Sequence, residues 1–247
     1  MIVSTSFQDI DFAKEKLDAL RPLDGQNVLT LGEAWDIEMV YESNGIEGNS
    51  LTLRETEMVV ARGMTIAGKP LKDHLEAVNL MAAWRRLLAM AAARGGVTES
   101  ETMELHAMVM TRISDEEAGR YRRGFVRIAG AKHVPPNAAK VPELMTALFS
   151  QTPLPHSVAE AARLHHGIAS VHPFSDGNGR TARLAMNLTL LRGGFPPVSL
   201  SPDLRVAYYA ALESADSGNE AAFIEFIGEA VRKEIARWLA LLTEGTR

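Results

Sequence analysis

A stretch of twelve residues, His172 to Arg183, constrains this chain more than any other part of its sequence. Apolar residues at helical spacing predict a helix over residues 157–171, and Pro173 ends it because proline disfavours the α conformation in the residue before it. Leucines at three- to four-residue spacing predict a second helix from about residue 184, which Gly193-Gly194 closes. We therefore expect a tight loop that leads directly into a helix N-terminus.

This loop has the composition of a phosphate site. The first turn of a helix has backbone N–H groups without partners, and its dipole favours an anion there. Gly177 and Gly179 allow positive φ angles and a close approach of the backbone to a ligand. Arg180 and Arg183 are three residues apart, so both guanidinium groups are expected on one face, where they could bind phosphates.

Three further side chains give the loop chemistry and an anchor. His172 stands at its entrance and could take a proton from an incoming hydroxyl. Asp176 could hold Mg²⁺, which takes few protein ligands when it bridges phosphates. Phe174 is apolar and is predicted to anchor the loop in the core. A base, a metal ligand and an anion cradle together favour nucleotide transfer.

A plainer interpretation is a glycine-rich turn between two helices with arginines on the surface. Each feature alone favours that alternative, whereas their density within one loop favours a functional site. The stretch is not a Walker loop, which requires a preceding strand and a Gly-Lys-Ser/Thr ending.

The stretch fits the motif HxFx[D/E]GNGRxxR at every defined position and so resembles the Fic family. The resemblance implies a mostly helical core and AMPylation, in which the AMP of ATP moves to a protein hydroxyl with Mg²⁺ while pyrophosphate leaves. It places the phosphates on the amides of Gly177, Asn178 and Gly179 and on Arg180 and Arg183. The related Doc branch has lysine at the second glycine, so Gly179 argues against phosphorylation.

Residues 43–49, SNGIEGN, are rich in turn formers, and their pattern alone predicts a helix end followed by a loop. They fit [S/T]xxxE[G/N], the inhibitory motif of Fic proteins, with Ser43 and Glu47 at its defined positions. The resemblance therefore implies that Glu47 pairs with Arg183 and competes with the γ-phosphate of ATP.

Composition bounds the remaining possibilities. The 247 residues can bury a substantial core, and a net charge of −5 gives no basic surface for nucleic acid. The absence of cysteine excludes disulfides and thiolate chemistry and fits a cytoplasmic protein. Residues 1–9 lack the basic start and apolar run of a signal peptide, and no apolar run is long enough to span a membrane. The adjacent pair His165-His166 has no pattern of zinc ligands around it.

We expect an all-α, mainly helical Fic-like fold with a small β-hairpin flap. One domain is expected over 1–247, with an N-terminal region, 1–50, and a helical core, 51–242. The flap is predicted over residues 120–136, and the resemblance implies that a target protein docks along it near Phe125–Val134. Further helices are predicted over residues 10–20, 30–43, 53–63, 71–94, 98–113, 142–150, 203–215 and 220–242.

The resulting hypothesis is a protein adenylyltransferase that acts on a Ser, Thr or Tyr hydroxyl and is autoinhibited by Glu47. Its partners are ATP and a target protein, and the N-terminal helices offer surface for a homodimer. Two alternatives stay open. Glu47 could orient a water that removes AMP from a modified protein, or the chain could be a nucleotide-sensing module with residual catalysis.

Overall fold

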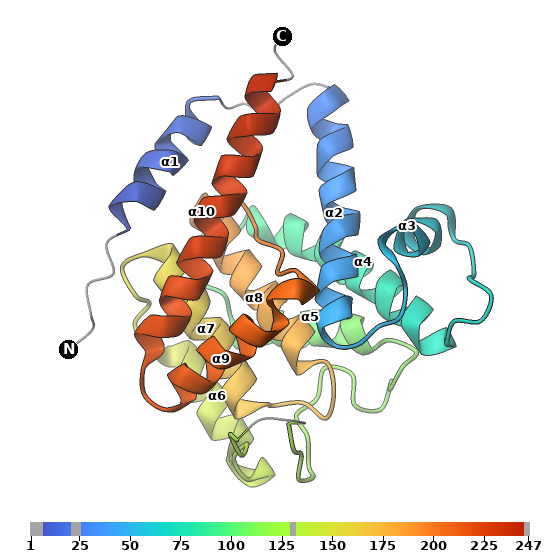
Figure 1. Ribbon diagram of the computed structural model, residues 1–247. Coiled ribbons are helices and arrows are strands. Elements are labelled where there is room, and N and C mark those ends of the chain that lie inside the picture. The colour runs from blue at the N-terminus through green and yellow to red at the C-terminus, as the bar shows by residue number, and fades with distance from the viewer. Residues whose placement is uncertain (1–6, 21–25, 129–131, 245–247) are drawn as a thin grey trace.

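The protein is described by a computed structural model over residues 7–20, 26–128 and 132–244. Within these ranges the chain forms α-helices joined by loops and two short 3₁₀ turns, with no β-strand (Figure 1). The mainly helical class predicted from the sequence is confirmed. The helices are α1 (Gln8–Asp18), α2 (Gln26–Ile46), α3 (Leu53–Arg62), α4 (Leu71–Ala91), α5 (Glu99–Met110), α6 (Val141–Ser150), α7 (Ser157–Val171), α8 (Asn178–Arg192), α9 (Arg205–Asp216) and α10 (Glu220–Glu244).

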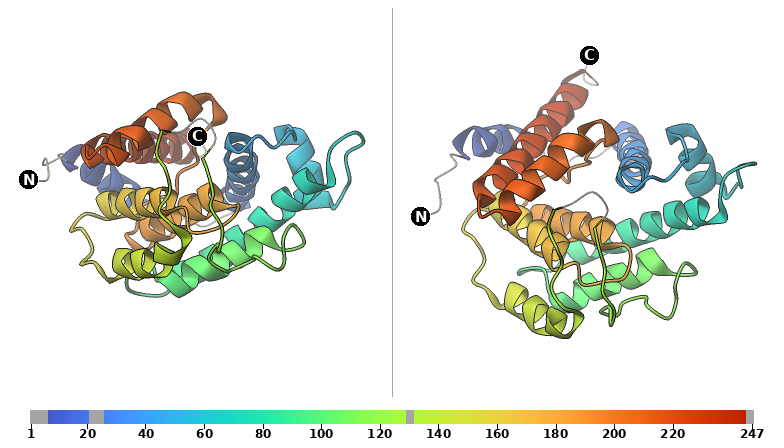
Figure 2. Two further views of the ribbon diagram at one scale, coloured as in Figure 1. Left: turned by 90° about the horizontal axis from the view of Figure 1, so that it is seen from below. Right: turned by 60° about the horizontal axis from the view of Figure 1, so that its bottom comes forward.

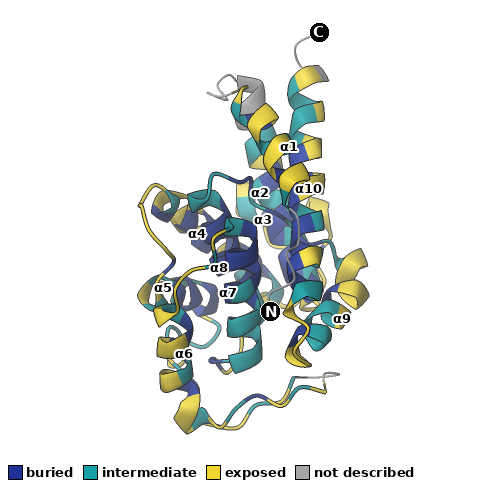
Figure 3. Cartoon of the chain, turned by 90° about the vertical axis from the view of Figure 1, so that its left-hand side faces the viewer, coloured by how far each residue is buried: buried dark blue, intermediate teal, exposed yellow. Residues whose placement is uncertain are grey.

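Helix α8 lies at the centre of the molecule and is buried on nearly every side (Figure 3). Leu184 and Leu188 join an apolar core shared with α2, α4 and α5. Met186 and Leu190 face a second core, which α7, α9 and α10 complete. A helix enclosed in this way has little freedom to move, so the loop that precedes it is held at a defined place.

Local sequence signals set several helix boundaries as predicted. Thr52 caps α3 and Thr98 caps α5, each in a reciprocal capping box with the glutamate three residues later. Helix α3 ends at Gly63, whose positive φ of 64° closes the helix in the left-handed conformation. Helix α7 has the predicted bounds.

Helix α2 corrects one expectation, because it continues to Ile46 instead of ending near Ser43. The turn-forming residues at 43–45 lie inside its last turn. Gly45 is there for packing, since a Cβ atom at this position would lie 2.8 Å from Cγ of Pro202. Ser43 and Asn44 are buried, so tertiary contacts outweigh their weak helix propensity.

The predicted β-hairpin is also corrected, because the described residues of 120–136 form no strand. Figure 2 shows two extended arms instead, and the expected turn at Gly130 lies outside the described residues. The Arg122 guanidinium donates to the carbonyl groups of Gly124 and Pro136, at 2.9 and 2.6 Å, and so satisfies acceptors on both arms. Pro135 and Pro136 cannot donate to a strand ladder.

The longest helix, α10, packs along α1 and α7 (Figure 1). Phe223, Ile227, Val231 and Ile235 lie buried at helical spacing on its inner face, as the sequence predicts. Charged residues cover the outer face. No helix in the described ranges is both long and apolar enough to cross a membrane.

Candidate active site

The loop between α7 and α8, residues 172–177, is called the motif loop here. It opens with His172, which ends α7 in the left-handed conformation with φ 50° and ψ 58°. This conformation is strained for a residue with a side chain, and the strain turns the chain sharply at the site. The backbone N–H of His172 still donates to Ile168 O at 2.9 Å.

The His172 ring presents one nitrogen that can accept a proton. Its Nδ1 lies 3.3 Å from the carbonyl oxygen of Ala169, so Nδ1 carries the proton and Nε2 keeps its lone pair. Burial lowers the pKa of His172 below the ordinary value, and the nearby charge of Arg122 acts in the same direction. The imidazole is therefore neutral at pH 7, as a general base requires.

Phe174 anchors the motif loop, as predicted, and its side chain is fully buried. Its ring stacks on His106 of α5, with the ring centroids 3.6 Å apart. Gly119 N–H donates to His106 Nδ1 at 3.0 Å, which leaves Nε2–H to donate to Asp176 O at 3.0 Å. Burial lowers the pKa of His106 to about 4, so this histidine stays neutral and supports the loop.

Asn178 fastens the loop from the other end. Its side chain accepts from Phe174 N–H at 2.9 Å and donates to Phe174 O at 2.8 Å. Both polar atoms of the side chain are thus used within the loop, so a ligand could bind Asn178 only through its backbone amide, in the first turn of α8.

The two glycines provide space as well as conformation. Gly177 precedes α8 with φ 77°, and a Cβ atom there would lie 3.1 Å from the sulfur of Met110. Gly179 lies in the first helical turn, where a Cβ atom would be 2.2 Å from Glu47 Oε1. Gly177 is buried against α5, whereas the missing side chain of Gly179 leaves room at the helix N-terminus that the Glu47 carboxylate occupies. A helix N-terminus is a place that suits an anion.

Arg183 is bound by residues from the last turn of α2 and the residue that follows it. It donates from Nη2 to Glu47 Oε1 at 2.7 Å, from Nη2 to Ser43 O at 2.8 Å and from Nε to Ser43 Oγ at 2.8 Å. Burial opposes the charge on Arg183, yet Glu47 and Tyr208 outweigh it and raise the pKa. The structure thus brings Ser43 and Glu47 into contact with Arg183, which lies about 140 positions later in the sequence.

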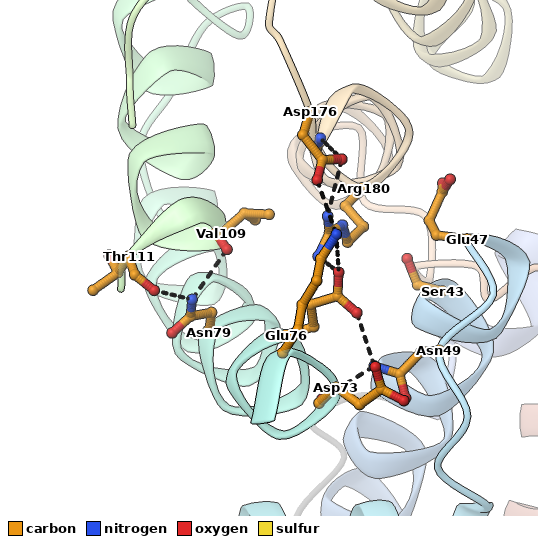
Figure 4. A network of polar contacts seen from close by, with 12 residues as sticks. Ser43, Glu47, Asn49, Asp73, Glu76, Asn79, Val109, Thr111, Asp176 and Arg180 are labelled. Carbon is orange, nitrogen blue, oxygen red and sulfur yellow. Dashed lines mark hydrogen bonds and ion pairs between the residues drawn. The ribbon is translucent and has the colours of Figure 1, made fainter. Parts of the chain in front are cut away.

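Arg180 takes a different place from the one expected. Its side chain is 2% exposed and points toward Glu76 of α4, with Nη1 3.2 Å from Glu76 Oε1 (Figure 4). Nη2 lies 3.5 Å from Asp176 Oδ1. The two arginines therefore serve different carboxylates, although their spacing predicted a common face.

The chain is also similar in sequence and structure to known proteins. Residues 96–190, which contain the motif loop, match the model of the Fic/DOC family. The chain carries a Fic domain. It is 32% identical over 244 residues to the protein adenylyltransferase Fic of Culex quinquefasciatus, covering 96% of this chain and 48% of that protein. The corresponding protein of Aedes aegypti is 34% identical over 239 residues, covering 93% of this chain and 47% of that protein. The chain thus spans about half the length of these curated relatives.

Solved structures agree on the fold. Fic-1 from C. elegans superposes with a TM-score of 0.84 at 28% identity, covering 95% of this chain and 70% of that chain. A Fic domain containing signaling protein from Bacteroides thetaiotaomicron reaches a TM-score of 0.85 at 23% identity, covering 96% and 97% of the two chains. This second likeness concerns the fold alone.

The Asp176 carboxylate of this Fic domain suits a hard cation. Burial opposes its ionisation, yet Arg180, the Gly177 N–H and Lys72 together lower its pKa. Its side chain is 46% exposed, so one oxygen can reach a ligand outside the loop. No cluster of three or more potential metal ligands occurs among the described residues. A single carboxylate fits Mg²⁺ that is held mainly by phosphate oxygens and water.

A cavity of about 390 Å³ opens beside the motif loop. His172, Gly179 and Glu47 line one end, and Tyr209 and Leu212 of α9 line an apolar wall. Its size and mixed lining suit the nucleoside part of a nucleotide. The motif did not predict this wall, because α9 carries no motif of its own.

Several residues that support the site belong to no motif in the sequence. Arg122 donates from Nε to His172 O at 2.8 Å and so ties the flap arms to the motif loop. Tyr208 lies buried beside His165, with OH and Nε2 3.0 Å apart, and contributes to the charge environment of Arg183. Lys72 lies 3.3 Å from Asp176 Oδ2. Such contacts join distant segments, and the local pattern around each residue is that of an ordinary helix or loop.

Proposed function

We propose that this chain is a protein adenylyltransferase that moves AMP from ATP to a Ser, Thr or Tyr hydroxyl of a target protein, held in check by Glu47. One observation carries the proposal: a neutral, partly buried His172 stands next to the N-terminus of α8, where a carboxylate, Glu47, already rests against Gly179 and the buried Arg183. The relatives named protein adenylyltransferase Fic support the same chemistry.

His172 Nε2 accepts the proton of the target hydroxyl as its oxygen attacks the α-phosphorus. The new oxygen–phosphorus bond forms as the bond to the β-phosphate oxygen breaks, and pyrophosphate leaves with its electron pair. The amides of Asn178 and Gly179 bind the phosphates, since the amide of Gly177 already donates to Asp176 Oδ1 at 2.6 Å, and Arg183 binds the γ-phosphate. Asp176 would hold Mg²⁺, which supplies positive charge to the phosphate oxygens. Positioning and charge stabilisation contribute most of the rate in reactions of this kind.

Arg183 itself shows an unused donor that fits this assignment. Its Nη1 is buried and makes no hydrogen bond of standard geometry within the described residues, while the Tyr208 hydroxyl lies near enough to act on the guanidinium. A Cβ atom on Gly179 would lie 3.1 Å from that nitrogen, so the donor borders the helix N-terminus. A γ-phosphate oxygen there would satisfy it.

Arg180 plays a different part in the proposal from a direct phosphate clamp. Because its guanidinium is buried between Glu76 and Asp176, it contributes positive charge beneath the phosphates and orients the Asp176 carboxylate. Asn178 contributes through its amide and through its hold on the loop.

Glu47 would inhibit the reaction because its carboxylate lies where the phosphate chain must pass. It occupies Arg183 and lies against Gly179, within the anion cradle. A negative charge there repels the triphosphate and removes one of its ligands.

The flap arms would receive the target protein. Phe125 and Val134 are exposed, at 77% and 67%, one on each arm. Extended arms with exposed apolar side chains suit a target segment that adds alongside them.

A second function, removal of AMP from a modified protein, is favoured by one observation. Glu47 lines the same cavity as His172, so its carboxylate could orient a water toward a phosphate bound there. Two experiments separate these functions. Incubation with α-labelled ATP, Mg²⁺ and target protein tests transfer, and we expect label on protein for Glu47→Gly and none for His172→Ala. AMP release from a pre-modified target by the wild type, lost in Glu47→Gly, would identify the hydrolytic function instead.

A further inference from the structure

Glu76 of α4 bridges two parts of the site that the motif treats as separate (Figure 4). Its Oε2 accepts a hydrogen bond from Asn49 Nδ2 at 2.9 Å, and its Oε1 lies 3.2 Å from Arg180 Nη1. The side chain is 8% exposed. We call residues 43–49, which contain Glu47, the lock segment. One buried carboxylate therefore joins the lock segment to the helix that carries the phosphate cradle.

The charge on Arg180 makes Glu76 necessary. Arg180 is 2% exposed, and a buried guanidinium without a counter-charge is strongly unfavourable. The carboxylates within ion-pair distance of it in the described structure are Glu76 and Asp176. Asp176 is 46% exposed and is our candidate metal ligand, so it cannot serve Arg180 alone when a cation is bound. Glu76 is the buried partner.

Asn49 divides its side chain between two tasks. Its Oδ1 accepts from Leu51 N–H at 3.0 Å and shapes the turn after α2. Its Nδ2 donates to Glu76 and to Asp73 O, the latter at 3.0 Å, and so attaches the turn to α4. The backbone N–H of Asn49 donates to Asn44 O at 3.1 Å, so this attachment extends into the last turn of α2.

The lock segment is thus held at two places. Glu47 contacts Arg183, and Asn49 contacts Glu76, which contacts Arg180. Both arginines project from α8, three residues apart. Only the first contact follows from the motif.

We propose that Glu76 is a positioning residue that couples the lock segment to the motif loop. Through Asn49 it holds the lock segment so that Glu47 stays on Arg183, and through Arg180 it orients Asp176. The expected effect of this coupling on catalysis rests on the proposed function. The coupling itself does not, since it is a property of the protein without substrate.

A swap of hydrogen-bond polarity tests the bridge. Asn49→Asp keeps Oδ1 for Leu51 but replaces the donor with an oxygen that faces the Glu76 carboxylate, so the contact becomes repulsive. Glu76→Gln has one acceptor oxygen, and when that oxygen faces Arg180 its NH₂ group faces the NH₂ group of Asn49. In the double variant, Asn49→Asp with Glu76→Gln, the glutamine NH₂ group can donate to the aspartate, and the contact forms again with reversed polarity.

The readout is hydrogen–deuterium exchange of the backbone amides of residues 47–49, which report the opening of the lock segment without any substrate. Each of these amides is bonded within the segment, to Asn44 O or Gly45 O. A hydrogen bond to a charged group corresponds to about 10- to 100-fold in an opening equilibrium. We expect exchange that many times faster in either single variant. In the double variant the contact with residue 76 forms again while the bond to Asp73 O stays lost, so exchange should be about tenfold slower than in Asn49→Asp without reaching the wild-type rate.

Ser50→Ala is the matched control. It removes the hydrogen bond from the Ser50 hydroxyl to the half-buried Asp73 carboxylate and leaves Glu76 unchanged. Exchange at residues 47–49 should stay near that of the wild type, because an exposed hydrogen bond of this kind contributes little. Fast exchange in the double variant, equal to that of the single variants, or unchanged exchange in both single variants, would overturn the proposal.

Transfer activity gives a second, separable result. Asn49→Asp should raise AMP transfer in the wild-type background and leave it unchanged in the Glu47→Gly background, where the lock is already absent. If exchange responds as expected but no variant, Glu47→Gly included, labels protein, the coupling stands and the adenylyltransferase proposal fails.

Discussion

The contact between Glu47 and Arg183 gives the most direct prediction for the proposed function. Glu47→Gly removes the carboxylate from the anion cradle and leaves Arg183 free for a phosphate. We expect tighter binding of ATP with Mg²⁺ and faster transfer of AMP, most visibly onto the protein itself.

The magnitude follows from the geometry. The Nη2–Oε1 distance of 2.7 Å describes a short charge-assisted hydrogen bond, and such bonds contribute about 1.5–3 kcal/mol. Glu47 is 31% exposed, so water weakens the contact and the lower part of that range, about 1.5–2 kcal/mol, applies. Since about 1.4 kcal/mol is a factor of ten, ATP affinity should rise roughly 10- to 30-fold.

Calorimetric titration with ATP and Mg²⁺ measures the affinity, and α-labelled ATP below saturation measures the initial rate of transfer. Glu47→Gln is the matched variant, because it keeps the size and one acceptor oxygen but loses the charge. It should give a smaller increase than Glu47→Gly.

The Arg183→Ala background provides the decisive comparison. In that background the lock and the γ-phosphate ligand are both absent, so Glu47→Gly should give only the much smaller gain that relief of charge repulsion provides. An equal gain from Glu47→Gly with and without Arg183 would refute the reasoning, as would equal ATP affinity and labelling by wild type and Glu47→Gly.

Three other predictions concern the motif loop and its support. His172→Ala should lower transfer by about 10²–10⁴-fold with ATP affinity unchanged, and a tenfold loss of ATP affinity would contradict this role. Because burial lowers the pKa of His172, the wild-type rate should decline only as pH falls below about 6.5. Asp176→Asn should abolish the gain in ATP affinity that Mg²⁺ produces, measured by calorimetry with and without chelator, and an undiminished gain would exclude Asp176 as the metal ligand. The folded protein binds a proton at His106 only near pH 4, whereas the unfolded chain does so near pH 6.5, so acid favours unfolding and stability should fall by about 2–3 kcal/mol from pH 7 to 4.5. Urea unfolding of His106→Gln should show a shallower loss over the same interval, and an equal loss would assign the acid sensitivity to other groups.

The local sequence predicts the form of the motif loop but not the partners of its arginines. The composition of residues 172–183 predicted the loop, its apolar anchor and the following helix N-terminus, and the structure shows all three. The direction of the Arg180 side chain could not be predicted from the sequence, because its partner Glu76 belongs to a different helix 104 positions away. The spacing of two arginines on a helix predicts a shared face only when no buried carboxylate attracts one of them.

Some helix boundaries could likewise be predicted from the local sequence, whereas others depend on tertiary contacts. The capping boxes at Thr52 and Thr98 were predictable because each involves groups only three residues apart, whose geometry one helical turn determines. The last turn of α2 was not, since Ser43, Asn44 and Gly45 favour a turn locally and become helical only when buried against other segments. The flap strands were predicted from β-branched and aromatic residues, but Arg122 takes up carbonyl groups of both arms.

By itself, then, the sequence determined the order and type of the helices and the chemistry of the motif loop, because these depend on interactions within a few residues. Only the tertiary structure decided which buried charges pair, how the lock segment meets Arg183, and which wall encloses the cavity beside His172. The physical reason is burial. Removing a charge or an amide from water requires a partner, and the partner is whichever group the packed helices place within reach.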